Sequence, residues 1–209
     1  MPGHLLLLLS AEVLKAGAAF PHDLQGDATG TIPYIKVGDL SNVDQGNRLR
    51  RSRNRVSPSI AAALRSPILP GGTIVLPKIG AALLTNRRAI LSEPSCLDQN
   101  VMGVTVHTGS PAFVYYCLAS IDLGDRSTPG PVPLLNEEAA KAVRISWPPR
   151  GEQDAIVRAL DARSIATRAP AAAIDRQIAL LHERRQALIT AAVTGTLQVP
   201  DTTTANAST

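Results

Sequence analysis

The residues best suited to chemistry are basic, and many of them are concentrated in about a quarter of the chain. From Lys36 to Arg88 the sequence holds ten lysines and arginines and only two acids, Asp39 and Asp44, so this block has a net charge of +8 in a chain of net charge +4. Clustered positive charge attracts polyanions, and nucleic acid is the first candidate. A solvated basic loop would have the same composition, so the block favours DNA binding without requiring it.

Within the basic block, residues 85–88 read Thr-Asn-Arg-Arg and join phosphate donors to an amide that can read a base edge. Arginine pairs with guanine and asparagine with adenine in the major groove. The remaining basic side chains suit the phosphate backbone. The candidate DNA-binding residues are Lys36, Arg50, Arg51, Arg53, Lys78, Thr85, Asn86, Arg87 and Arg88.

Motifs for catalysis or for a cofactor are missing from the sequence. It contains no phosphate-binding loop, no Gly-x-Gly-x-x-Gly, and no Asn-Pro-Pro or Asp-Pro-Pro followed by an aromatic residue, as a base-amino methyltransferase needs. Cys96 and Cys117 are isolated and the four histidines are scattered. We therefore expect no catalytic residue, no metal and no cofactor. The cysteine usage and the short apolar run Leu5–Leu9 indicate a cytoplasmic protein without a membrane span.

The elements that would position these residues form an α+β body over residues 20–147. Residues 1–19 precede it as an apolar segment that is helix-permissive around Leu5–Leu14, and residues 197–209 form a tail expected to be disordered. The segment Leu83–Leu91 has a basic middle between apolar ends, which is typical of a hairpin or of a strand passing through a tip. Clearer signals predict a short strand ending in a turn over 32–40, strands over 74–78 and 100–106, and helices over 56–65 and 111–121.

Residues 148–196 are predicted to form a helical arm. Positions 167, 171, 174, 178, 181, 185, 188 and 192 step by four and three, which places one largely apolar stripe along a helix. Because Pro170 removes a backbone donor, we expect either a kinked helix or two helices, roughly Glu152–Thr167 and Ala171–Thr194. Such a stripe needs a partner helix, although an ordinary amphipathic helix lying on its own domain fits the spacing equally well. The candidate seam residues are Ile174, Ile178, Leu181 and Leu188.

Several ordered motifs together cover nearly all of residues 12–197. They are the segments Gly30–Leu40, Pro70–Val75, Leu83–Leu91, Cys96–Asn100, Ile121–Gly124, Pro148-Pro149 before Glu152-Gln153, and Leu181–Gly195. In these motifs the chain closely resembles the specificity subunit of type I restriction–modification systems.

The resemblance implies a globular target-recognition domain that reads one half of a split site in double-stranded DNA. It also implies a long helix that packs against a second such helix. A complete member carries two domains and two helices. It recruits modification subunits, which methylate adenine with S-adenosylmethionine, and a restriction subunit, which uses ATP. The specificity subunit itself is not an enzyme.

This sequence carries one recognition domain and one arm, which indicates a half-subunit or a truncated form, and its start at Leu5–Leu9 favours truncation. A twofold homodimer through the arms would then read an interrupted palindrome. The alternatives are a truncated, non-functional remnant and a helical oligomerisation scaffold without specific DNA binding.

Overall fold

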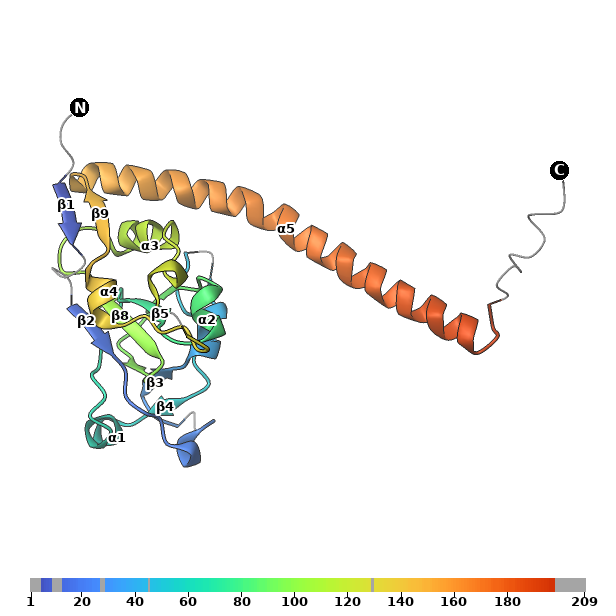
Figure 1. Cartoon of the computed structure of the whole chain (residues 1–209), viewed down its shortest axis with the longest axis horizontal. Helices are drawn as coiled ribbons and strands as arrows, with labels where there is room; N and C mark the ends of the chain where they lie inside the picture. The colour runs from blue at the N-terminus through green and yellow to red at the C-terminus, as the bar shows by residue number, and fades with distance from the viewer. Residues whose placement is uncertain (1–4, 9–12, 27–28, 45, 129, 198–209) are drawn as a thin grey trace. The chain divides into compact units, whose positions relative to one another are not determined.

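The computed structural model describes residues 5–8, 13–26, 29–44, 46–128 and 130–197. The chain forms two compact units, residues 1–161 and residues 162–209 (Figure 1). The first is a mixed α+β body and the second contains most of a long helix. This confirms the predicted fold class. The predicted tail lies outside the described residues apart from Leu197.

The body contains short strands with short helices and 3-10 turns between some of them. The strands are β1 (Leu5–Leu8), β2 (Val13–Ala16), β3 (Ile32–Ile35), β4 (Arg55–Val56), β5 (Ile74–Pro77), β6 (Ala89–Ile90), β7 (Cys96–Leu97), β8 (Val101–Thr105) and β9 (Arg144–Trp147). The α-helices are α1 (Pro58–Ala63), α2 (Ala81–Leu84), α3 (Pro111–Ala119), α4 (Glu137–Lys141) and α5 (Arg150–Val193). Single 3-10 turns are η2 (His22–Leu24), η3 (Val37–Ser41) and η4 (Gly124–Arg126).

The centre of the body is a four-stranded sheet in the order β2-β8-β5-β6, with antiparallel neighbours. Every residue of β5 and β8 is buried, because successive side chains of a strand point to opposite faces and both faces are covered here. Ile74 and Leu76 pack with α3 residues such as Phe113 on one face. Val75 packs with Leu97 on the other. Both faces of the sheet therefore belong to the core of the body.

A three-stranded sheet has the strand order β4-β3-β7. Helix α1 packs against it. The predicted start of α1 is confirmed: the Ser57 side chain accepts a hydrogen bond from the Ile60 backbone N–H, and Pro58 is the first helical residue. Proline suits this position because the first helical N–H has no partner within the helix. The predicted strands at β3, β5 and β8 and the helix α3 are also confirmed.

Burial of Tyr34 makes the fold sensitive to alkali. The side chain is fully buried, its hydroxyl donates to Ala18 O at 2.7 Å, and burial raises the pKa of Tyr34 from 10.0 to about 12. The protonated form is therefore favoured in the folded state, so this stabilisation is complete below pH 10 and is lost as the pH rises through about 12. The linked loss is roughly 2–3 kcal/mol.

We expect Tyr34→Phe to reduce this alkaline loss of stability. The measurement is the free energy of unfolding in urea at about pH 9 and about pH 12. An unchanged difference between the two pH values would contradict the assignment.

The beginning of the chain differs from the prediction. The described residues of the helix-permissive run Leu5–Leu14 belong to strands, because β1 pairs with β9, and β2, which begins at Val13, pairs with β8. Backbone pairing with strands about ninety or more residues away outweighs the weak local helix propensity. The segment before residue 20 therefore contributes strands to the sheets of the body.

The prediction of a hairpin, or of a strand passing through a tip, over Leu83–Leu91 is also wrong except at β6. The first part of this segment belongs to α2, which begins after Gly80 and buries Leu83 in the core. The chain then turns through Asn86, whose φ of 54° lies in the left-handed region, and continues into β6. Asparagine tolerates this conformation better than most residues. Helix α4 was not predicted, although Asn136 caps it by accepting from Ala139 N.

Helix α5 runs unbroken from Arg150 to Val193 and contains Pro170. The predicted pair of separate helices is therefore not observed. The proline removes the donor for the Ala166 carbonyl, but Ala166 is exposed, so water can satisfy the freed group.

Candidate nucleic-acid interface

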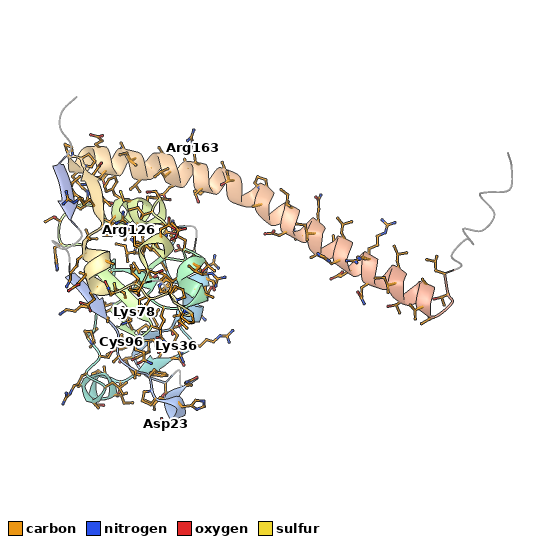
Figure 2. The ribbon with its side chains drawn as sticks, in the orientation of Figure 1. Asp23, Lys36, Lys78, Cys96, Arg126 and Arg163 are labelled. Atoms are coloured by element: carbon orange, nitrogen blue, oxygen red, sulfur yellow. The ribbon has the colours of Figure 1, made fainter. Side chains whose placement is uncertain are left out.

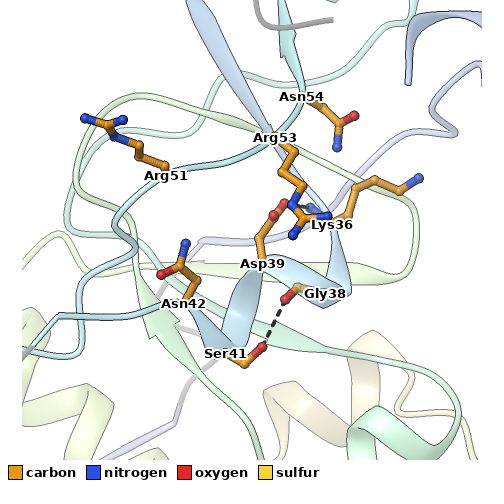
Figure 3. Close-up of a pocket in the computed structure, with 8 residues that line it drawn as sticks. All are labelled: Lys36, Gly38, Asp39, Ser41, Asn42, Arg51, Arg53 and Asn54. Carbon is orange, nitrogen blue, oxygen red and sulfur yellow. Dashed lines mark hydrogen bonds between the residues drawn. The ribbon is translucent and has the colours of Figure 1, made fainter. Parts of the chain in front are cut away.

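A polar cleft of about 540 Å³ lies between the turn after β3 and the extended segment before β4 (Figure 3). Three of the predicted DNA-binding residues line it together: Lys36, Arg51 and Arg53. The other lining residues are Gly38, Asp39, Ser41, Asn42 and Asn54. The cleft therefore combines cationic, amide, hydroxyl and carboxylate groups from two segments of the basic block.

Asp39 holds the near wall of the cleft in place. Its Oδ2 accepts from Lys36 N at 2.9 Å and lies 3.1 Å from the Ser52 hydroxyl, which in turn lies 2.7 Å from Tyr34 O. Leu40, the next residue, is buried in the core and fixes turn η3 to the sheet. The Asp39 carboxylate thus joins the two segments that form the cleft.

The positive charges of the cleft are available to a ligand. Arg51 and Arg53 are exposed, and no described residue accepts a hydrogen bond from either guanidinium group. The Lys36 Nζ lies 5.6 Å from the centre of the Phe20 ring, which is a cation–π contact. Such groups bind phosphate, and a guanidinium also pairs with the O6 and N7 atoms of guanine.

Two exposed polar residues of the lining were missed in the sequence. Asn42 and Ser41 are exposed at the turn that follows β3, and the Ser41 hydroxyl donates to Gly38 O at 3.0 Å. An asparagine amide is a side chain that pairs with adenine. In the folded chain, residues 51–54 return beside the end of turn η3, and this places Ser41 and Asn42 opposite an arginine-rich segment. The sequence alone does not show this proximity. Asn54 is buried and its Oδ1 accepts from Gly26 N, so it supports the loop.

The other candidates lie outside this cleft. Arg50 is exposed, donates from Nε to Val43 O at 3.2 Å, and lines a small neighbouring pocket with Arg51. Lys78 is half-buried after β5. Thr85 is exposed at the end of α2 and its hydroxyl donates to Ala82 O, while Arg87 is exposed in the following turn. These side chains do not line the cleft with Lys36.

Arg88 does not fit the predicted role as a DNA contact, because the side chain is only 5 % exposed. Its guanidinium donates to Asn86 O at 3.0 Å, to Asn86 Oδ1 at 2.6 Å and to Ile121 O at 2.8 Å. Burial lowers the pKa of Arg88 to about 10. Arg88 therefore connects the left-handed turn before β6 to the end of α3 instead of facing solvent.

Replacing Arg88 by alanine is expected to destabilise the body by about 2–4 kcal/mol, because three acceptors lose their donor inside the protein. Arg87→Ala, one residue away and exposed, should change stability by less than about 0.5 kcal/mol. Urea unfolding followed by circular dichroism measures both. Equal stabilities for the two variants would contradict the bracing role of Arg88.

A second surface lies on α5 within the second unit. The seam residues are exposed: Ile174 by 55 %, Ile178 by 48 %, Leu181 by 64 % and Leu188 by 48 %. Arg185 interrupts this row. Large aliphatic side chains repeated at this spacing are typical of a helix that packs against another helix.

Within the described ranges, no group of three or more His, Cys, Asp or Glu residues is arranged to hold a metal ion. None of the helices there combines the length and the apolar character needed to cross a bilayer.

Comparison with known proteins identifies the domain. The profile of the type I restriction modification DNA specificity domain matches residues 11–169. Among solved structures, the S subunit of a type I restriction–modification system from M. genitalium superposes with a TM-score of 0.54 and 14 % identity, over 77 % of this chain and 38 % of that one. The HsdS subunit from Thermoanaerobacter tengcongensis gives 0.58 and 17 %, over 94 % and 46 %.

A chain from a structural study of complex assembly and conformational transition in the type I R-M system gives a TM-score of 0.68 and 16 % identity, over 92 % of this chain and 46 % of that one. This chain thus spans less than half the length of each of these three solved structures. No curated protein is significantly similar to it in sequence. At these identities the structures establish the fold, and the match over residues 11–169 establishes the family. The chain belongs to the family of type I restriction–modification DNA specificity domains.

Proposed function

We propose that this protein binds double-stranded DNA through the cleft of Lys36, Arg51 and Arg53 and reads one half of a split target sequence. The main observation behind this proposal is that Arg51 and Arg53 line the cleft, are exposed and have no described hydrogen-bond partner. Asn42, whose amide is exposed, lines the same cleft, while the Asp39 carboxylate is engaged in the wall. The arginines supply salt-dependent attraction to phosphate. Asn42 and an arginine supply the contacts to base edges that distinguish one sequence from another.

The second half of the target would be read by a second domain. Helix α5 supports this part of the proposal, because its exposed aliphatic row suits a partner helix of the same kind. A twofold pair of chains joined through α5 would present two identical clefts and would select an interrupted palindrome. The length of the helices would fix the distance between the two half-sites.

In this proposal the protein acts without catalysis of its own. It recruits the modification subunits and the restriction subunit to the chosen site in the cytoplasm, and these partners perform methyl transfer and cleavage. The support is the family of the domain together with the solved S subunits of the same fold.

Binding to duplex DNA across a series of salt concentrations tests the central claim. Methylome sequencing of cells that carry the protein with its cognate modification subunit supplies the target duplex, and a shuffled duplex of equal length is the control. We expect the target to bind at least about 1,000-fold more tightly than the shuffled duplex at physiological salt. A steep salt dependence with equal affinities for both duplexes would instead support a scaffold that binds nucleic acid without specificity.

A further inference from the structure

The beginning of α5 is attached to the body by a buried glutamine. Gln153 is 1 % exposed, and both ends of its side-chain amide are used: Oε1 accepts from Ser110 N at 2.9 Å, and Nε2 donates to Pro148 O at 2.9 Å. Ser110 is also the N-cap of α3, where its hydroxyl accepts from Phe113 N. One side chain of α5 is therefore bonded to the start of α3 and to the segment that leads into α5 itself.

The backbone around Gln153 leaves little room for another arrangement. Gly109 has a φ of 84°, and a Cβ on it would lie 2.5 Å from Trp147 Cζ2 and 2.9 Å from Gln153 Oε1. Its carbonyl accepts from the Arg150 guanidinium at 2.6 Å. Glycine is needed here both for the left-handed backbone and for the close approach. The site is thus tightly packed as well as hydrogen-bonded.

A second contact joins the same two helices further along. The Tyr116 hydroxyl of α3 donates to Asp161 Oδ1 of α5 at 2.5 Å. Asp161 lies eight residues after Gln153, which is about 12 Å along a helix. Between them, Ile156 and Val157 pack against the core of the body. The hydrogen bonds at Gln153 and at Asp161 are separated by two helical turns, so together they determine the direction of this part of α5. The bonds at one of these residues alone would leave the helix free to pivot.

From this geometry we infer that Gln153 is a positioning residue, which fixes the orientation of the first three turns of α5 on the DNA-reading domain together with the Tyr116–Asp161 hydrogen bond. The inference rests on the proposed function for its purpose, because orientation matters to DNA only if α5 spaces two reading domains. The orientation itself is a property of residues 1–161 and is measurable on the chain alone.

The test measures the orientation directly, by electron–electron double resonance between spin labels in the full chain. Labels are placed on Gln99→Cys in the body and Ala159→Cys on α5, both at exposed positions, in a Cys117→Ser background with the fully buried Cys96 retained. Gln153→Met keeps the size of the side chain and removes both hydrogen bonds. We expect the distance distribution of this variant to broaden about twofold, because the buried hydrogen bonds of the first attachment point are lost and only the exposed Arg150–Gly109 contact remains there.

The matched control is Thr73→Val, which removes a buried hydrogen bond elsewhere, the one between the Thr73 and Thr105 hydroxyls at 3.1 Å. It should lower the urea midpoint in the same way as Gln153→Met but leave the distance distribution narrow. A Gln153→Met distribution as narrow as that of the wild-type protein would overturn the inference. Equal broadening in Thr73→Val would also overturn it, since the effect would then be general loosening.

If Gln153→Met does not fold, Tyr116→Phe removes only the second contact and should broaden the distribution by a smaller amount; no change would contradict the two-point attachment. The DNA readout is kept separate by sequencing the methylome with the cognate modification subunit. We expect Gln153→Met to add sites whose spacing differs by one base pair. Broadened distances with an unchanged methylated motif would support the attachment and count against the spacing role within the proposed function.

Discussion

The double replacement Arg51→Ala and Arg53→Ala is expected to weaken binding to the target duplex by about 10- to 100-fold at physiological salt and to lower the slope of log K against log salt by about 2. The reason is that both guanidinium groups line the cleft and lack a described protein partner, so both are available to phosphate or base. The folded state should be unaffected, because both side chains are exposed.

Arg126→Ala is the matched control for this variant. Arg126, labelled in Figure 2, is an exposed arginine on η4. It is not among the residues that line the cleft. Fluorescence anisotropy with labelled duplex, repeated at several salt concentrations, measures all three proteins. If Arg126→Ala weakened binding as much as the double variant, the cleft would have no special part in DNA binding.

The second large effect is expected at α5, where Leu181→Glu should raise the dissociation constant of the homodimer by at least about 100-fold. A carboxylate at the seam would be transferred from water into an apolar contact twice in each dimer. Sedimentation velocity at micromolar concentration measures the change, and the circular dichroism spectrum should keep its helical signal.

Leu180 provides an unusually close control for this experiment. It is the neighbouring leucine and is equally exposed, 63 % against 64 % for Leu181, but it lies off the row of Ile174, Ile178 and Leu188. Leu180→Glu should leave the dimer intact. A wild-type protein that sediments as a monomer both alone and with the modification subunit would remove the homodimer from the proposal.

The parts of the fold that local chemistry determines were predictable. Ser57-Pro58 marks the start of α1, and the continuous apolar runs of β5 and β8 mark strands covered on both faces. Strands β1 and β2 were not predictable in this way, because their pairing partners β9 and β8 lie far along the chain and the side-chain pattern of Leu5–Leu8 is uniform. In such cases tertiary pairing decides between helix and strand.

The candidate site shows the same division. Its charged residues stood out because arginine is conspicuous in a sequence, but charge alone did not separate the exposed Arg87 from the buried Arg88. Their difference arises from the left-handed turn at Asn86, which directs Arg88 toward the carbonyl of Ile121. Asn42 was missed for a related reason, since only the return of residues 51–54 beside η3 makes it part of a cleft.

The pairing of β1 with β9 has a consequence for how this domain can be inherited. The register places Leu5 opposite Trp147, so the strand by which the chain enters the body and the strand by which it departs toward α5 are immediate antiparallel neighbours. A module with adjacent entry and departure points can be exchanged between genes by two crossovers, without disturbing whatever flanks it. Recombination could thus attach different specificity domains to one helix, each with its own turn after β3 and its own arginines.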